Sequence, residues 1–181
     1  MFLWHVGATV AFVRYAFRDE AMDLRYLAIG AILPDVIDTP IAMAMWSSWE
    51  APRLATHSLL FGSIVMVAVL VGTSGGVRRK QWMLVAIGVL MHLGLDAMWA
   101  DPDTLWWPLF GWEFTRVGLS TFGAYVSTVL SDPSMWAGEI AGFAYLVLLW
   151  RSSDLGDKNA RQALLSTGRV SAPIGRGGLG S

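Results

Sequence analysis

Five apolar segments, separated by short polar connections, constrain this chain more than any other feature of its sequence. They occupy residues 3–17, 26–46, 57–73, 81–100 and 136–150. Residues 26–46 reach the length of roughly 20 residues that an α-helix needs to cross a bilayer. Only 15% of the residues are charged, against about 25% in an average soluble domain. The pattern predicts an all-α, polytopic membrane helical bundle, with about four to five transmembrane helices and a short N-terminal helix.

The domain organisation follows from the same pattern. We expect one membrane-embedded domain over residues 1–150 and a polar, Gly-rich tail over residues 151–181, which should be mobile. Pro34 and Pro40 lie inside the 26–46 segment, so its helix is expected to be kinked or broken there. Residues 115–131 are mildly apolar and are predicted to form a helix that lies on the surface or re-enters the membrane.

The distribution of basic residues predicts how the bundle is oriented. If four crossings follow the short first helix, residues 14–25, 75–80 and 151–181 lie on one side and carry 11 of the 13 Lys and Arg residues. Cytoplasmic loops are enriched in Lys and Arg. The sequence therefore predicts a cytoplasmic tail and an opposite, extracytoplasmic side that carries only Arg53 and Arg116.

Ionisable residues inside the apolar segments mark a candidate site. A charged group in a lipid-embedded segment is costly unless it has a partner, and residues three or four apart share one face of a helix. Two pairs have this spacing, and the predicted topology places them at compatible depths with the histidines, toward the extracytoplasmic side. The candidate metal ligands are His5, Asp35, Asp38, His57, His92 and Asp96.

The types of these residues favour a divalent metal ion. All three histidines of the chain belong to the set, and there is no Cys anywhere. Imidazole and carboxylate ligands without thiolate suit Zn²⁺ best here, with Mn²⁺ or Fe²⁺ as alternatives. A divalent cation would also neutralise carboxylates that could not otherwise stay ionised in apolar surroundings. The net charge of −1 argues against nucleic acid as a partner.

Other interpretations stay open at this point. His5 could be an interfacial residue, His57 a polar group at the start of a helix, and His92 with Asp96 a hydrogen-bonded pair without a metal. Together these groups could also form a proton or ion relay in a transporter component. The same ligands would equally serve a non-catalytic metal-binding membrane scaffold.

Several short motifs, in order, resemble a known family. They are GAILPDVID at 30–38, ATHSLLFG at 55–62 and MHLGLDAMW at 91–99, preceded by HVG at 5–7 and followed by WWPLF at 106–110. The set resembles the membrane-bound metal-dependent hydrolases typified by YdjM and YbcI, over residues 1 to about 115. That family is in turn similar to zinc-dependent phospholipase C and P1-type nucleases. The resemblance implies a multi-pass protein of the bacterial inner membrane.

The resemblance also implies a chemistry, namely hydrolysis of a phosphoester by a metal-activated water. One metal ion would be surrounded by Asp35 or Asp38, His57, His92 and Asp96, and Asp96 would bridge to a second ion held partly by His5. Since no His remains for a third, one or two ions are expected. The less committed of Asp35 and Asp38 would be the general base. Membrane lipids are the expected partners, and a lipid or lipid-linked phosphate is the expected substrate.

Overall fold

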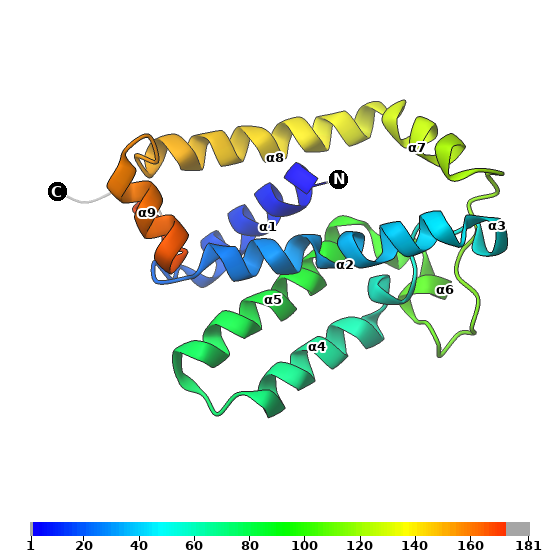
Figure 1. Cartoon of the computed structure of the whole chain (residues 1–181), viewed down its shortest axis with the longest axis horizontal. Helices are drawn as coiled ribbons and strands as arrows, with labels where there is room; N and C mark the ends of the chain where they lie inside the picture. The colour runs from blue at the N-terminus through cyan, green and yellow to red at the C-terminus, as the bar shows by residue number, and fades with distance from the viewer. Residues whose placement is uncertain (1, 173–181) are drawn as a thin grey trace.

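The computed structural model describes residues 2–172, and over this range the chain is helical without strands. Its body consists of long helices that run in alternating directions (Figure 1), so their ends gather at two opposite ends of the bundle. These helices are α1 (Phe2–Phe17), α2 (Leu24–Ala44), α4 (Leu59–Gly72), α5 (Gly76–Leu95) and α8 (Pro133–Ser152). The all-α prediction and the five apolar helices are confirmed.

Short helical elements fill the connections between the long helices. They are α3 (Trp46–Trp49), η1 (Ala55–His57), η2 (Met98–Ala100), α6 (Pro102–Leu105), α7 (Phe122–Leu130) and α9 (Lys158–Thr167). In Figure 1, α3 and α6 lie at one end of the bundle, here called the α6 end. Helix α9 and the α4–α5 connection lie at the other, here called the α9 end.

Helix α2 continues through both of its prolines, so the break that the prediction allowed for is absent from it. It begins at Asp23, whose side chain caps the helix by accepting a hydrogen bond from the backbone N–H of Arg25. A neighbouring segment contacts the Pro34 turn, because the Thr56 hydroxyl donates to the Pro34 carbonyl at 3.1 Å.

The segment at 115–131 also differs from the prediction of one helix. Its first part is extended, with Gly118 at a φ of +68°, and helix α7 begins only after Thr121, whose side chain caps it. The backbone N–H of Val117 donates to the Glu50 carbonyl at 3.0 Å, which ties this stretch to the turn after α3.

Glycines bring the long helices into close contact in two pairs. A Cβ atom added to Gly88 of α5 would lie 2.7 Å from the Leu27 carbonyl oxygen of α2, and one added to Gly7 of α1 would lie 2.5 Å from the Gly142 carbonyl oxygen of α8. Small residues at helix contacts are typical of membrane bundles. The α2–α5 pair and the α1–α8 pair therefore form two closely packed units.

The outer surface of the bundle is apolar in many places. Exposed large apolar side chains include Val71 of α4 (83% exposed) and Ile140 of α8 (64% exposed). Among the described residues, α2 alone is both long and apolar enough to cross a membrane, while α1 and α4 are apolar but shorter. One candidate span is therefore shown, and the remaining predicted spans stay predictions.

Residues 151–172, which belong to the predicted tail, contain the end of α8 and the whole of α9. Helix α8 continues to Ser152, and Asp157 caps α9 by accepting hydrogen bonds from the backbone of Asn159 and Ala160. This segment folds back because it satisfies buried donors of the bundle, among them the Arg14 guanidinium, which donates to the Ala172 carbonyl at 2.7 Å. Residues 173–181 of the predicted tail lie outside the described residues.

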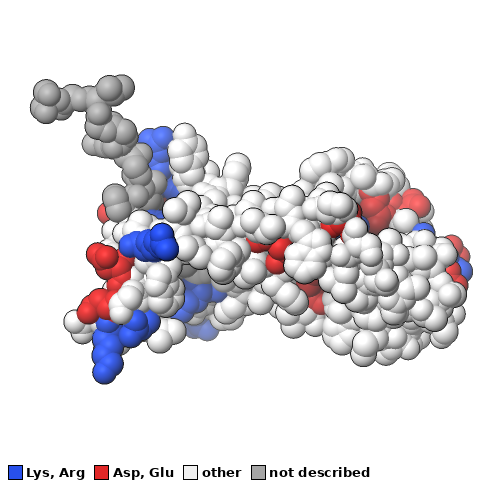
Figure 2. All heavy atoms as spheres, turned by 90° about the horizontal axis from the view of Figure 1, so that it is seen from above, with Lys and Arg blue, Asp and Glu red and all other residues white. Residues whose placement is uncertain are grey.

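Charged side chains are unevenly distributed along the bundle. In the view of Figure 2, most of the visible Lys and Arg side chains gather at one end, and the opposite end shows mainly Asp and Glu. The first turns of α5 and α9, both at the α9 end in Figure 1, carry Arg78, Arg79, Lys80 and Lys158. This asymmetry is the one from which the orientation in the membrane was predicted.

Candidate metal centre

The fold brings the predicted site residues together from four separate parts of the chain. Helix α1 carries His5, α2 carries Asp35 and Asp38, η1 carries His57, and the C-terminal end of α5 carries His92 with Asp96. The three histidine side chains are at most 1% exposed, whereas Asp35 keeps 20% of its side chain exposed. The predicted convergence of these groups is thus present in the structure.

The end of α5 places His92 and Asp96 together. The helix stops at Leu95, earlier than predicted, and Asp96 is its C-cap, followed by Ala97 in the left-handed conformation at a φ of 53°. The Asp96 N–H still donates to the His92 carbonyl at 2.9 Å, which preserves the helical four-residue relationship. Both side chains therefore reach the same side of the bundle.

Asp38 fixes the position of His57. Its carboxylate accepts hydrogen bonds from the backbone N–H of Leu54 at 2.7 Å and from Nδ1 of His57 at 2.7 Å. Ser58 then caps α4 by accepting from the Phe61 N–H. This arrangement explains why His57 lies in a short 3₁₀ turn before the helix and why its Nε2 atom is aimed at the cluster.

Four ligand atoms from His57, His92, Asp35 and Asp96 surround one small space. The Nε2 atoms of the two histidines are 3.1 Å apart. Oδ1 of Asp35 lies 3.5 Å from the His57 Nε2 and 3.6 Å from the His92 Nε2. Oδ2 of Asp96 lies 3.7 Å from the His57 Nε2 and 3.9 Å from the His92 Nε2. Tetrahedral ligands at about 2.0–2.2 Å from a zinc ion are separated by about 3.3–3.6 Å. The five separations are therefore close to those between ligands of one metal ion.

The hydrogen bonds of the two histidines show which ring nitrogens are available. Nδ1 of His92 lies 2.7 Å from the Ala31 carbonyl oxygen, and Nδ1 of His57 contacts the Asp38 carboxylate. Since both partners are acceptors, each Nδ1 carries the hydrogen and each Nε2 presents a lone pair in the neutral ring. Two lone pairs and two carboxylate oxygens thus converge, which is an arrangement that a cation would stabilise.

His5 lies beside this group and contacts it in two ways. Its ring stacks on the His92 ring with centroids 4.1 Å apart, and its Nε2 lies 2.9 Å from Oδ1 of Asp96. His5, His92 and Asp96 form a second group that could hold a metal ion. However, His92 has a single available nitrogen, so both groups cannot use it for separate ions at once.

Two groups of residues could hold a metal ion: one consists of His5, His92 and Asp96, and the other of Asp35, His57 and His92. Asp38, although it was predicted as a ligand, belongs to neither group. It lies behind His57, is 1% exposed, and is held by the Leu54 and His57 N–H groups. A carboxylate that accepts from the distal N–H of a ligating histidine orients that ligand and raises its basicity.

Two of the clustered groups lie beyond the ends of the long helices and have shifted pKa values. Burial lowers the pKa of His57, but its hydrogen bonds to Asp35 and Asp38 outweigh this effect and raise the pKa above the usual range. Burial raises the pKa of Asp96, but the hydrogen bond with His5 and the charge of Arg53 hold it well below the usual range. The carboxylates therefore favour a positive charge at the centre.

A cavity of about 720 Å³ opens onto the cluster. Asp35 and Asp96 lie in its wall together with Arg53 and, from α7, Tyr125. Arg53 donates through Nε to Oδ2 of Asp96 at 2.8 Å and is 33% exposed. Sequence reasoning missed both Arg53 and Tyr125. A signal available in the sequence was that Arg53 is one of only two basic residues outside the segments assigned to the cytoplasmic side.

The fold and the cluster together define an all-helical protein with a candidate membrane span and a buried His/Asp group that could hold a metal ion. Residues 3–156 match the family described as YdjM inner membrane protein. The chain therefore belongs to this family of membrane proteins, as the motifs had indicated. No curated protein and no solved structure matches the chain.

Proposed function

We propose that this protein is a metal-dependent hydrolase of the inner membrane that cleaves a phosphoester, with a lipid or lipid-linked phosphate as its substrate. The observation that supports this proposal most strongly is the convergence of two histidine lone pairs and two carboxylate oxygens, with five separations of 3.1–3.9 Å. Nitrogen and oxygen ligands in this geometry fit Zn²⁺, with Mn²⁺ or Fe²⁺ as alternatives.

One ion would be held by His57, His92 and Asp96, which leaves its fourth position for a water beside Asp35. A bound divalent metal lowers the pKa of a coordinated water to about 7 and stabilises negative charge on phosphoryl oxygens. Asp38 orients His57, and His5 orients Asp96 through the 2.9 Å hydrogen bond. We favour one ion over two because the second candidate group shares the single available nitrogen of His92.

Asp35 is the better candidate for the general base. Of the two aspartates predicted for this role, it lines the cavity and is 20% exposed, whereas Asp38 is 1% exposed and bonded to His57. A general base must lie within hydrogen-bond reach of the water whose proton it takes. The carboxylate of Asp35 would accept that proton at the border between cluster and cavity.

The walls of the cavity suit a phosphoester with an apolar portion. Arg53 uses Nε for Asp96, so its terminal nitrogens are left to bind phosphate oxygens, for which a guanidinium is well shaped. Trp4, Leu95, Phe122 and Met135 add apolar surface to the same cavity. This combination supports a lipid phosphate as substrate.

The proposal includes a multi-pass topology with the site toward the extracytoplasmic side. The alternating directions of the long helices place the cluster toward the α6 end, and the chain's basic residues concentrate on the segments assigned to the other side. Cysteine-accessibility labelling at Gly111 and Ser131, against Gly75 and Gly156, tests the sidedness. Labelling of all four from the same side would contradict the proposed topology.

The function itself is tested by metal content and turnover on detergent-purified protein. Elemental analysis of wild type beside His92→Ala should show about one equivalent of metal that is lost in the variant. Turnover of synthetic phosphodiesters and of phosphatidic or diphosphate lipids should then depend on the metal. Metal without any turnover would favour a scaffold, and absence of metal after reconstitution would favour a proton relay.

A further inference from the structure

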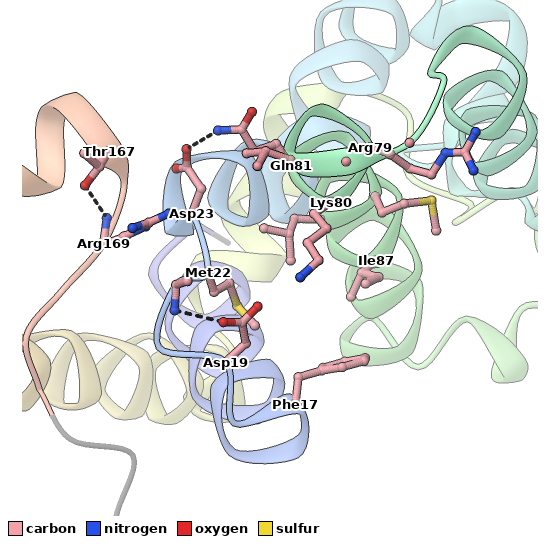
Figure 3. Close-up of a pocket in the computed structure, with 16 residues that line it drawn as sticks. Phe17, Asp19, Met22, Asp23, Arg79, Lys80, Gln81, Ile87, Thr167 and Arg169 are labelled. Carbon is pink, nitrogen blue, oxygen red and sulfur yellow. Dashed lines mark hydrogen bonds between the residues drawn. The ribbon is translucent and has the colours of Figure 1, made fainter.

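A second cavity, of about 730 Å³, lies at the α9 end and takes no part in the proposed hydrolysis. Its walls come from the α1–α2 connection, the first turns of α5, and the chain just after α9 (Figure 3). Along α5 its lining ends at Ile87, five residues before His92 of the His/Asp cluster.

The interior of this cavity is apolar. Phe17, Met22, Met83, Leu84 and Ile87 line it. Leu84 and Met22 belong to the buried core, while Phe17 at the end of α1 is 60% exposed. An open apolar lining of this size at the surface of a membrane protein suits a hydrocarbon chain.

Two cations at the rim of the cavity, Lys80 and Arg169, have side chains that make no hydrogen bond or ion pair with other residues in the described part of the chain. Figure 3 shows Lys80 extending from α5 toward the turn that contains Asp19 and Met22, whereas the Arg79 guanidinium points away. Arg79 is in fact bound to the end of α4, where Nη2 donates to the Leu70 carbonyl at 3.1 Å.

The two carboxylates of the same cavity are already engaged. The Asp23 carboxylate accepts two hydrogen bonds from Arg25, one from Nε at 2.9 Å and one from Nη2 at 2.7 Å. It accepts a third from the Gln81 side chain at 3.2 Å. Asp19 accepts from the Ala21 N–H at 2.9 Å. With Arg25 paired to Asp23, the cations of the rim exceed its anions.

We propose that this cavity binds one anionic phospholipid, with an acyl chain along the apolar lining and the phosphate between Lys80 and Arg169. The charge of the rim is complementary to a phosphate headgroup. Cationic residues next to a membrane surface attract anionic lipids. The basic residues at this end match the predicted cytoplasmic side, so the site faces the inner leaflet. A soluble phosphate would satisfy the rim but would leave the apolar lining uncovered.

Native mass spectrometry of the full-length protein in detergent tests the site, with phosphatidylglycerol and phosphatidylcholine of identical acyl chains as probes. Wild type should bind phosphatidylglycerol about fivefold more tightly or better. Lys80→Gln with Arg169→Gln should abolish this preference. Arg78→Gln is the matched control, because Arg78 is an exposed cation of the same helix that does not line the cavity.

A second variant separates binding from folding. Val77 lines the cavity and is 67% exposed in the first turn of α5. Val77→Glu places a negative charge beside the phosphate position, yet an acidic residue at a helix N-terminus stabilises the helix. This variant should keep its thermal stability and lose the preference for phosphatidylglycerol.

Three results would overturn the proposal. The first is equal affinity of wild type for the two lipids, and the second is an equal loss of preference in Arg78→Gln. The third is displacement of phosphatidylglycerol by glycerol phosphate at a similar concentration, which would show that the acyl chain contributes nothing.

Discussion

His57 and His92 direct their Nε2 atoms at each other across 3.1 Å, while each ring donates its Nδ1 hydrogen away from that contact. The acceptors of these hydrogens are the Asp38 carboxylate and the Ala31 carbonyl, both on α2. One helix thus fixes the orientation of two histidines that come from other parts of the chain. This arrangement predicts how substitutions of the site residues change metal binding and stability.

Ligand and orienting residues should differ in their effect on metal binding. His92→Gln removes a ligand atom and should abolish stoichiometric binding. Asp38→Asn leaves the ligand atoms in place but weakens the support of His57, so affinity should fall about 10–100-fold with the stoichiometry retained. Equilibrium competition with a chromophoric chelator measures both. If Asp38→Asn loses the metal as completely as His92→Gln, Asp38 is itself a ligand.

His5→Phe tests whether a second ion is present. Phenylalanine preserves the stacking on His92 but cannot bond to Asp96. With one ion held by His57, His92 and Asp96, the metal-to-protein ratio should stay unchanged and the affinity should fall about tenfold. A ratio that drops from two to one in elemental analysis would instead assign His5 to a second ion.

The stability of the metal-free protein should decrease as the pH rises. The pKa of His57 is raised above its ordinary value of 6.5. A raised pKa in the folded state stabilises the protein fully below the unfolded pKa, and this contribution is lost as the pH rises through the folded pKa. Thermal unfolding between about pH 6 and about pH 9 should show the loss in stripped protein.

The thermal stability of the metal-loaded protein should not change with pH over the same range, because its ligands are already deprotonated. His57→Gln should flatten the profile of the stripped protein. A profile that is identical in wild type and His57→Gln would show that another group is responsible.

The contact between α2 and α5 should control both stability and metal affinity. An added Cβ at Gly88 would lie 2.7 Å from backbone atoms of Leu27 and Ala31, so Gly88→Ala must push the helices apart at a cost of about 1–3 kcal/mol. The shift also moves the Ala31 carbonyl away from His92, and metal affinity should fall.

Gly94→Ala is the matched control on the same helix, since no atom lies within 4 Å of the added Cβ. It should be neutral or slightly stabilising, because alanine has the higher helix propensity. Thermal unfolding and chelator competition check both variants. Equal effects of the two substitutions would show that helix propensity, and not the close contact, sets the response.

Much of the fold could be predicted because apolar runs and helix length carry the information. The five long helices correspond to the apolar segments, and the predicted site residues do converge. The tail could not be predicted, because its order depends on distant partners: the Leu24 N–H donates to the Gly168 carbonyl at 2.8 Å, and Arg14 donates to Ala172. No local pattern in residues 151–172 reveals these donors.

The roles of the individual residues in the candidate site also could not be predicted from the sequence. Asp35 and Asp38 have the same chemistry and neighbouring positions, and only the contacts of η1 distinguish the one beside the cavity from the one behind His57. Arg53 reaches the site from the loop between α3 and η1, and the path of that loop depends on tertiary packing. Spacing thus identified the set of residues, and three-dimensional contacts assigned their parts.

The packing of α1 against α8 through Gly7 and Gly142 has a consequence for how the protein is made. Helix α1, which carries His5, packs on α2 and α5 and also on α8, which is synthesised well after them. The α2–α5 pair, with His57, can assemble earlier. A nascent chain that stalls before α8 therefore leaves the face of α1 around Gly7 uncovered, although His92 and Asp96, the residues that contact His5, are already made.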